Sequence, residues 1–467
     1  MTAVWNCSSP EWPNCPGFCP LTADPGNGAS VRNPPENHCS SHDLIVIGGG
    51  PAGIFAAGFA ALNGARVLLL EKNRRCGAKL LITGKGRCNV THDEDDPRHF
   101  AEAFGRNGRA LLTALYAFGP RDVVDFFRQR GLDLKTERGG RVFPARGGAV
   151  DVQQVLDRFL RDCGVELRTG CEVRHLQVEG GRISGVVTGR GISRAARYLV
   201  ATGGLSYPET GCTGDGYAWA EACGHRLVKP EAALMPIRLA EDWTGEWCRL
   251  NLKNIRIAAL LDGSPFDERF GEAFFTRTGI GGPIILDMSS AIREALTKGK
   301  VSLEVDFKPA VSDELFDKRL QRELADHANR DFRNALGKLL PRDMIPRFIL
   351  LSGIDPGKKC HSVTRTERRG LLELFKRLPL RVTGHEGLKK AIVTSGGVSL
   401  KDVDMRSLRS KKIENLYFAG EMLDIDGPTG GFNLQVCWST GYLAGISAAR
   451  VDSPNPPAIS GFGCRYG

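Results

Sequence analysis

One short segment near the start of the chain constrains the fold more than any other. Leu44 to Ile47 is an unbroken apolar run, and Gly48, Gly50 and Gly53 follow it in the pattern G-x-G-x-x-G. Such a run fits a strand that is buried on both faces of a parallel sheet. The first glycine permits a tight turn, the second lets a pyrophosphate approach the backbone, and the third lets the next helix pack on the strand. The segment therefore predicts a Rossmann-type unit with a phosphate at the start of its helix.

An acidic residue ends the next predicted strand, Arg66 to Leu70. Glu71 lies 18 residues beyond Gly53, at a position where a carboxylate accepts hydrogen bonds from ribose hydroxyls and repels a 2′-phosphate. Strand, helix and acid in this register predict a dinucleotide site. They do not distinguish NAD from FAD.

A second glycine-rich segment lies near the other end of the chain. Asn415 to Ala419 is typical of a strand that ends at Gly420 and Glu421, and Gly427 to Gly431 leads into another predicted helix. In a flavin site, such a turn places helix N–H groups against the N1/O2 edge of the ring, which gains negative charge on reduction. The two segments, with Thr202-Gly203-Gly204 closing a strand between them, therefore predict FAD as the cofactor.

Length, composition and charge exclude several other classes of protein. The chain has 467 residues, a length that suits two or three domains. Its net charge is +10. No stretch approaches the roughly 18 apolar residues of a membrane helix, and residues 1–42, rich in Pro, Asn, Ser and Cys, carry no secretory signal. We interpret residues 1–42 as a disordered extension and expect a cytoplasmic protein without a membrane partner. No set of His or Cys has metal-ligand spacing, so we expect no metal site.

The positive charge is concentrated between Asp355 and Glu414, where fifteen Lys and Arg face seven Asp and Glu. Such a stretch is compatible with a nucleic-acid surface. It contains few aromatic residues on which bases could stack. We therefore favour a solvated helical face over a nucleic-acid partner.

The order of predicted elements divides the chain into a nucleotide-binding domain and an insert. The domain comprises 43–204 and 394–450, the insert spans 205–393, and 451–467 form a tail. Within the insert, strand-like patterns at about 234–308 and 380–393 predict a barrel or a sandwich, and about 312–377 is mostly helical. The fold class is α/β.

Seven dispersed blocks of the sequence form a recognisable set. They are Val46–Gly53, Lys79–Asn89, Arg141–Pro144, Ala201–Gly204, Thr213–Gly216, Thr394–Val398 and Phe418–Gln435. Together they resemble one family, the bacterial NAD(P)/FAD-dependent flavoproteins of the aminoacetone-oxidase type, which has a branch related to a bile-acid reductase. The resemblance implies a Rossmann-type FAD-binding domain interrupted by a β-barrel and a small helical subdomain. One stretch departs from the family. Where the family usually has Phe-Thr-His-Tyr-Gly-Ile-Ser-Gly-Pro, this chain has Arg277 and Thr278 in place of His and Tyr.

Motif and resemblance together give a set of expected FAD-binding residues. They are Gly48, Gly50, Pro51, Ala52, Gly53, Glu71, Lys72, Lys79, Gly86, Arg87, Cys88, Asn89, Thr202, Gly203, Gly204, Gly420, Glu421, Gly430, Gly431, Phe432 and Asn433. No catalytic residue is identified. Tyr207, Arg277 and His361 are candidates for the substrate pocket, although a structural role is the stronger interpretation for each.

The leading hypothesis is an FAD-dependent oxidoreductase that passes a hydride through flavin N5 to or from a small organic molecule. NADH or NADPH would serve as a transient donor, since no second complete G-x-G-x-x-G follows the first. One alternative is an oxygen-using amine oxidase. An alternative from another class is a flavin-containing factor that binds or modifies nucleic acid.

Overall fold

The largest sheet of the molecule carries the predicted nucleotide-binding unit. The computed structural model describes residues 42–248 and 250–449. Seven strands lie in the order β19-β20-β21-β10-β1-β2-β6. They are β1 (His42–Ile47), β2 (Val67–Leu70), β6 (Glu166–Arg168), β10 (Ala195–Val200), β19 (Val403–Asp404), β20 (Arg409–Ser410) and β21 (Leu416–Phe418). The strands from β21 to β6 are parallel, and β1 and β2 are almost wholly buried, as their apolar sequences predict.

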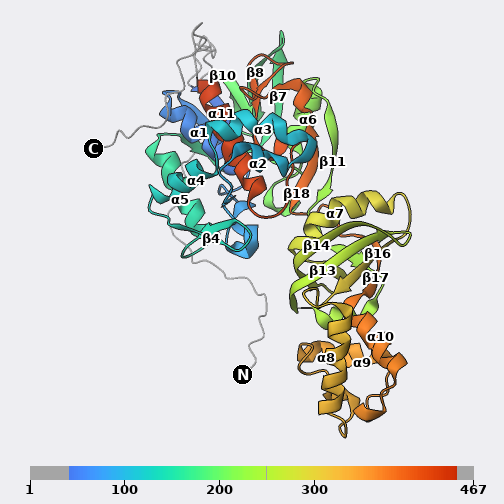
Figure 1. Cartoon of the computed structure of the whole chain (residues 1–467). Helices are drawn as coiled ribbons and strands as arrows, with labels where there is room; N and C mark the ends of the chain where they lie inside the picture. The colour runs from blue at the N-terminus through green and yellow to red at the C-terminus, as the bar shows by residue number, and fades with distance from the viewer. Residues whose placement is uncertain (1–41, 249, 450–467) are drawn as a thin grey trace, which may run out of the picture. The chain divides into compact units, whose positions relative to one another are not determined.

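Two helices from opposite ends of the chain pack on this sheet side by side (Figure 1). They are α1 (Pro51–Leu62) and α11 (Phe432–Ala449). A Cβ atom on Gly441 or Gly445 of α11 would lie 2.4 Å from a backbone oxygen of α1, that of Ala52 or Ala56. Only glycine allows the two backbones to come so close. The close approach brings the two glycine-rich segments of the sequence together.

Smaller elements complete the nucleotide-binding part. The helices are α2 (Pro97–Glu102), α3 (Gly108–Ala117), α4 (Pro120–Arg128), α5 (Ala149–Asp162) and α6 (Asp215–Ala222). The strands outside the main sheet are β3 (Thr91–His92), β4 (Leu134–Glu137), β5 (Arg141–Pro144), β7 (Val173–Glu179), β8 (Arg182–Thr188), β9 (Gly191–Ser193), β11 (Leu227–Ala233) and β18 (Val393–Val398).

The insert contains a closed barrel of six strands in the order β12-β15-β14-β13-β16-β17, which confirms the predicted barrel. The strands are β12 (Ile237–Leu239), β13 (Asn251–Leu261), β14 (Ser264–Phe275), β15 (Gly279–Gly281), β16 (Val301–Asp306) and β17 (Leu378–His385). Between β16 and β17 the chain forms α8 (Asp313–Asp326), α9 (Ile345–Ser352) and α10 (Arg365–Lys376). Phe316, Phe348 and Phe375 from these helices share one core with the barrel.

A helix interrupts the stretch that was predicted as barrel strands only. Residues Pro283–Leu296 form α7. Pro283 occupies its first turn, where a missing N–H costs nothing, and Ile285, Met288 and Ile292 are buried at the spacing of one helical face. The prediction of strands throughout 234–308 is therefore wrong at α7, because its apolar residues follow the helical period.

The boundary of the insert also differs from the predicted one. In the segment 205–233, Tyr217 and Trp219 belong to the hydrophobic core of the nucleotide-binding part, and β11 pairs with β18. The chain thus enters the barrel only after β11. The predicted extension 1–42 lies outside the described residues except for His42, which begins β1, and the predicted tail 451–467 lies outside them entirely.

Candidate functional site

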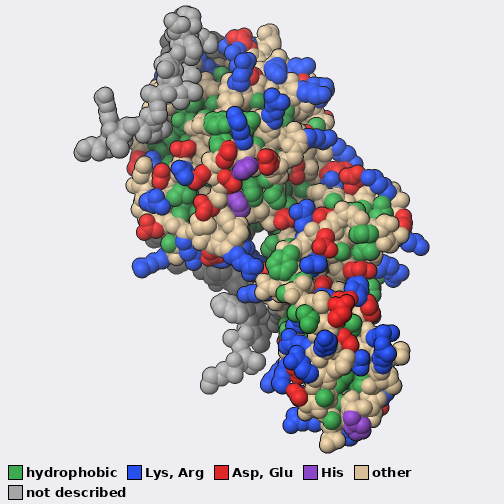
Figure 2. Space-filling model, in the orientation of Figure 1, with side chains coloured by type: hydrophobic (Ala, Val, Ile, Leu, Met, Phe, Trp, Pro, Cys, Tyr) green, Lys and Arg blue, Asp and Glu red, His purple; other side chains and the backbone are tan. Residues whose placement is uncertain are grey.

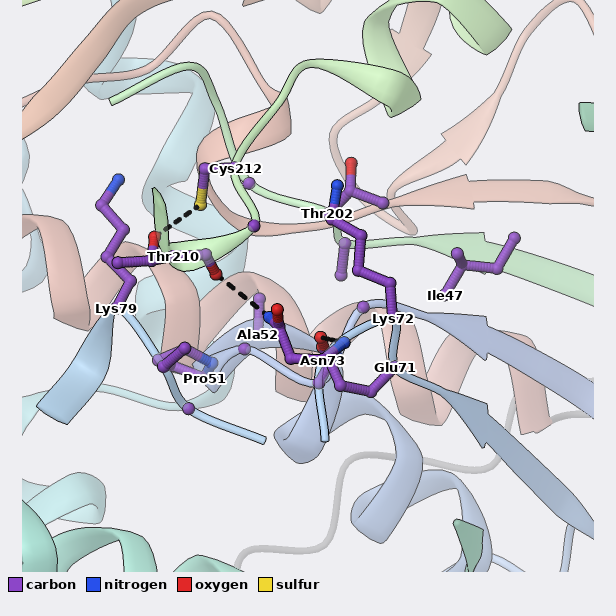
Figure 3. Close-up of a pocket in the computed structure, with 18 of the residues that line it drawn as sticks. Ile47, Pro51, Ala52, Glu71, Lys72, Asn73, Lys79, Thr202, Thr210 and Cys212 are labelled. Carbon is purple, nitrogen blue, oxygen red and sulfur yellow. Dashed lines mark hydrogen bonds between the residues drawn. The ribbon is translucent and has the colours of Figure 1, made fainter. Parts of the chain in front are cut away.

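A cleft opens where β1, β2 and β10 end (Figure 3). The space there that no protein atom occupies is about 840 Å³, a figure that includes open solvent at the mouth. The carboxyl ends of parallel strands are the usual place for a ligand in an open α/β sheet.

The floor of the cleft is the glycine turn between β1 and α1. A Cβ atom on Gly48 would lie 2.5 Å from the Ala201 oxygen, and one on Gly53 would lie 1.9 Å from the Gly48 oxygen. At Gly50, by contrast, a Cβ atom would meet nothing within 4 Å. Gly48 and Gly53 are therefore required by packing, whereas Gly50 leaves open space at the start of α1. This is the cradle in which a phosphate would lie against helix N–H groups.

Glu71 is fixed at the side of the cleft by two backbone groups. Its carboxylate accepts hydrogen bonds from the N–H groups of Gly49 and Asn73, each at 2.7 Å. The side chain is buried but lines the cleft. An ionised carboxylate has further acceptor sites, so Glu71 can also bind the hydroxyls of a ribose.

The second glycine-rich segment contributes Glu421 to the same cleft. Glu421 Oε2 pairs with Lys79 Nζ at 2.7 Å, and Oε1 accepts the Thr394 N–H at 2.8 Å and the Ser206 hydroxyl at 3.1 Å. Burial is the largest single effect on Lys79 and lowers its pKa, but the charge and hydrogen bond of Glu421 act with other groups in the opposite direction, and the net shift is upward. Lys79 is therefore a cation at neutral pH. Its charge is balanced by the Glu421 carboxylate, so the pair adds no net charge to the cleft.

A loop after β10 crosses the cleft and is tied to the end of β2. Lys72 Nζ lies 2.6 Å from an oxygen of Asp215, and Asn73 Nδ2 donates to the Thr210 oxygen at 3.1 Å. Figure 3 shows Asn73 and Thr210 facing each other across this opening. The loop can therefore cover the outer part of a bound nucleotide.

Three thiols of the nucleotide-binding part, two of them in the cleft lining, have raised pKa values. Burial raises the pKa of Cys437 to about 12 and also raises that of Cys212. Cys88, the thiol of the Lys79–Asn89 block, has its pKa raised to about 12 for the same reason. None of these three is a thiolate at neutral pH, so they are not reactive nucleophiles.

The cleft brings together many, though not all, of the expected FAD-binding residues. Those lining it are Gly48, Gly50, Pro51, Ala52, Glu71, Lys72, Lys79, Thr202, Gly203 and Glu421. The group Gly86 to Asn89 lies outside this lining. Arg87 packs its guanidinium over the Phe143 ring at 4.1 Å. The Asn89 side-chain oxygen is buried and has no hydrogen-bond partner in the described structure.

The turn Gly427–Gly431, just before α11, is held by several side chains. Asn433 Oδ1 accepts the Gly427 N–H at 2.9 Å, and His92 Nδ1 lies 3.1 Å from the Gly430 oxygen. The His92 ring also stacks on Phe432, with 4.3 Å between ring centres. The turn is therefore rigid and presents the free N–H groups at the start of α11.

The three candidate pocket residues lie in different places. Tyr207 is half-buried beside the cleft with φ +52, and burial raises the pKa of its phenol. Arg277 is exposed between β14 and β15. His361 is exposed next to α10, with Nδ1 2.8 Å from the Ala328 oxygen. Tyr207 is linked to the cleft through its carbonyl oxygen, which accepts the hydroxyl of the lining residue Thr210 at 2.7 Å.

Sequence reasoning did not place several residues that line the cleft. They are Asn73, Gly77, Ala78, Cys171, Val173, Thr210, Gly211, Cys212, Asp215, Trp219 and Cys437. Asp215 lies in the block Thr213–Gly216, one of the blocks that carry the family resemblance, but the sequence did not indicate which residue it would contact. The contact between Asp215 and Lys72 depends on the fold, which brings the start of α6 close to the end of β2.

The residues of the cleft fit FAD. The open cradle at Gly50 suits a pyrophosphate, Glu71 suits a ribose, and a glycine turn stands at the start of a second helix, as the chemistry of a flavin edge requires. Among the described residues, no group of three His, Cys, Asp or Glu is placed to hold a metal ion. Fold and cleft thus define an FAD-binding protein of the Rossmann class.

The chain belongs to the HI0933-like Rossmann family, whose model matches residues 42–447. It is 32% identical over 410 residues to the 3-dehydro-bile acid delta(4,6)-reductase of Clostridium scindens, covering 87% of this chain and 98% of that protein. It is 28% identical over 406 residues to the ribosomal RNA dihydrouridine synthase of Escherichia coli, covering 86% of this chain and 96% of that one. The predicted family and its FAD-dependent oxidoreductase class are confirmed.

A solved structure shares the fold. The 3-ketosteroid delta1-dehydrogenase of Sterolibacterium denitrificans superposes with a TM-score of 0.51 at 14% identity, covering 87% of this chain and 99% of that one. The similarity confirms the architecture of the FAD-binding domain. Within residues 42–248 and 250–449, no helix is both long and apolar enough to cross a bilayer.

Proposed function

We propose that this protein is an FAD-dependent reductase that adds hydrogen across a carbon–carbon double bond conjugated with a carbonyl group. One observation carries the proposal: residues from two distant segments line a single cleft at the start of α1, in a chain whose relatives, matched over almost their whole length, are named for such reductions. A delta(4,6)-reductase of a 3-dehydro-bile acid and a dihydrouridine synthase are both named for saturating a bond of this kind. We extend only this shared chemistry to the present chain.

Different residues would bind different parts of the cofactor. The cradle at Gly50 would receive the pyrophosphate, Glu71 the ribose, and the turn before α11 the N1/O2 edge of the ring. When bound and reduced by two electrons, the flavin would supply a hydride through N5. The second hydrogen would come as a proton to the carbon next to the carbonyl. Tyr207 is the candidate donor of this proton, because a phenol can donate one and the Tyr207 carbonyl oxygen accepts the hydroxyl of the cleft residue Thr210 at 2.7 Å.

The small organic substrate would bind between the nucleotide-binding part and the insert. Contacts between these two parts are present: Arg138 Nη1 lies 3.2 Å from Asn254 Oδ1, and Lys85 Nζ lies 4.8 Å from the centre of the Phe274 ring. Lys85 belongs to the kinked 3-10 helix Leu80–Gly86, and Phe274 belongs to β14. A substrate entering there would meet cationic and aromatic side chains.

Anaerobic reduction tests the proposal directly. The purified protein should be yellow, and FAD at about 100 times its Kd should stabilise the apoprotein by about 2.7 kcal/mol. NADH or NADPH should bleach the flavin without oxygen, and an enone substrate should restore its colour. Bleaching by an amine alone would instead support the amine-oxidase alternative. A colourless protein that FAD does not stabilise would rule out the proposal.

A second candidate is the reduction of a pyrimidine in RNA. Two relatives, from Escherichia coli and Haemophilus influenzae, are ribosomal RNA dihydrouridine synthases at 28% and 27% identity. Figure 2 shows Lys and Arg gathered over the helical part of the insert. Four of them are exposed and form no ion pair within the described residues: Lys318, Arg322, Arg365 and Arg369. Phosphates could neutralise these charges.

Salt dependence separates the two candidates. If RNA is the substrate, changing Arg365 and Arg369 to Gln should weaken RNA binding and lower the slope of log K against log salt by about 2. Arg158→Gln with Arg161→Gln, on the exposed face of α5, makes the same change in net charge and is the control. An unchanged slope in the first variant, or no RNA binding at low salt, favours the small-molecule substrate.

A further inference from the structure

A carboxylate of the insert holds the flavin-facing turn of the nucleotide-binding part. Asp287 lies on α7, and its Oδ1 accepts the Thr429 N–H at 2.7 Å while Oδ2 accepts the Thr429 hydroxyl at 3.1 Å. Thr429 is the central residue of the turn Gly427–Gly431. The helix α7 packs on β13 and β14 of the barrel. The contact therefore links two parts of the molecule that belong to different hydrophobic cores.

The other anchors of this turn come from the nucleotide-binding part itself. Asn433 holds Gly427 and also donates from Nδ2 to the Pro428 oxygen at 3.1 Å, and His92 contacts the Gly430 oxygen. Thr429 stands between these two anchors. Its backbone N–H and its hydroxyl both point to Asp287. The conformation at the centre of the turn is thus fixed from the insert.

The surroundings of Asp287 show that it does not serve as one half of an ion pair. Arg269, the cation that acts on it, is bonded through Nε to Asp267 at 3.0 Å. Burial raises the pKa of Asp287, and its bonds from Thr429 oppose that shift. A partly buried carboxylate with neutral donors contributes little net stability. Its value lies in the geometry that it imposes on Thr429.

We propose that Asp287 is a positioning residue through which the insert fixes the turn Gly427–Gly431 and thereby sets the affinity for FAD. The inference rests on the proposed function. A glycine-rich turn has many accessible conformations in the absence of anchors. Holding it in one conformation aims the free N–H groups at the start of α11 before the cofactor arrives, which removes an ordering cost from binding.

Titration of the apoprotein with FAD tests the role of Asp287. Asp287→Ala should raise the Kd for FAD about tenfold, which corresponds to the loss of about one charge-assisted hydrogen bond. Asp287→Asn keeps an acceptor for the Thr429 N–H and should have a smaller effect. Glu294→Gln is the matched control, because Glu294 is an exposed carboxylate on the same helix, paired with Lys298. Hydrogen exchange of the Thr429 amide in the apoprotein should be faster in Asp287→Ala than in the unaltered protein, and it should be unchanged in Glu294→Gln.

Thr429→Val provides the second variant, since it removes only the hydroxyl contact and spares the buried carboxylate. Combined with Asp287→Ala it should add nothing to the tenfold loss, because both changes act through one contact. Full additivity would overturn the inference, as would equal FAD affinity in Asp287→Ala and Glu294→Gln. If the unaltered apoprotein itself fails to bind FAD, the proposed function falls instead.

Discussion

Replacing Gly50 by aspartate is expected to abolish FAD binding and leave the protein folded. Gly50 is the N-cap of α1 with φ −81 and ψ 178, a conformation open to any residue. A Cβ atom there would meet nothing within 4 Å. Aspartate is a preferred N-cap, so the free energy of unfolding should stay unchanged or rise by up to about 1 kcal/mol.

The same carboxylate would stand in the cradle that we assign to the pyrophosphate. Steric overlap and like charge both act against the cofactor, so the Kd for FAD should rise at least about 100-fold, or about 2.7 kcal/mol. Fluorescence titration of the apoprotein measures the Kd, and urea denaturation measures the stability. Gly337→Asp is the control, because Gly337 also has nothing within 4 Å but lies in the helical part of the insert. Normal FAD binding by Gly50→Asp would contradict the assignment of the phosphate to the start of α1.

Replacing Glu421 by alanine is expected to destabilise the protein by about 3 kcal/mol, because it leaves Lys79 as a buried charge without its partner. The side chains of Lys79 and Glu421 are only 20% and 16% exposed. The N–H of Thr394 would also lose its acceptor, whereas the Ser206 hydroxyl keeps the Ile392 oxygen at 3.2 Å. With the carboxylate gone, its upward effect on the pKa of Lys79 is lost, and that pKa should fall.

Urea denaturation at neutral pH gives the change in the free energy of unfolding. Combining Glu421→Ala with Lys79→Met should recover part of the loss, since no buried charge then remains. Glu294→Ala breaks a pair whose side chains are 58% and 70% exposed and should cost less than about 1 kcal/mol. A loss in Glu421→Ala no larger than in this control would mean that solvent already screens the Lys79–Glu421 pair.

The parts of the fold that could be predicted are those with short-range physical causes. The apolar run of β1, the glycines that follow it and Glu71 lie within one βαβ unit, and their spacing alone defines a nucleotide site. The prediction failed where a short apolar stretch fits both the helical and the strand period. The segment that forms α7 was predicted as strands.

The contacts that complete the site depend on distant segments. Glu421 meets Lys79 across 342 positions of the chain, and Asp287 meets Thr429 across 142. Such pairs follow from the packing of α1 against α11 and of α7 against the turn, which no local pattern encodes. Tertiary structure likewise separates the three candidate pocket residues. Tyr207 is linked to the cleft residue Thr210, whereas Arg277 and His361 are exposed elsewhere.

The amino-acid sequence by itself determined the Rossmann-type unit and the choice of FAD, whereas the strand patterns of the insert were compatible with a barrel or a sandwich. The first two follow from glycine positions and apolar periods, because steric limits on the backbone and burial of apolar side chains act over a few residues. The closure of the barrel is seen only in the tertiary structure. Only the tertiary structure decided which side chains face the cleft and which charged side chains form ion pairs with one another. Electrostatic pairing and close packing act through space, and the residues that they join lie far apart along the chain.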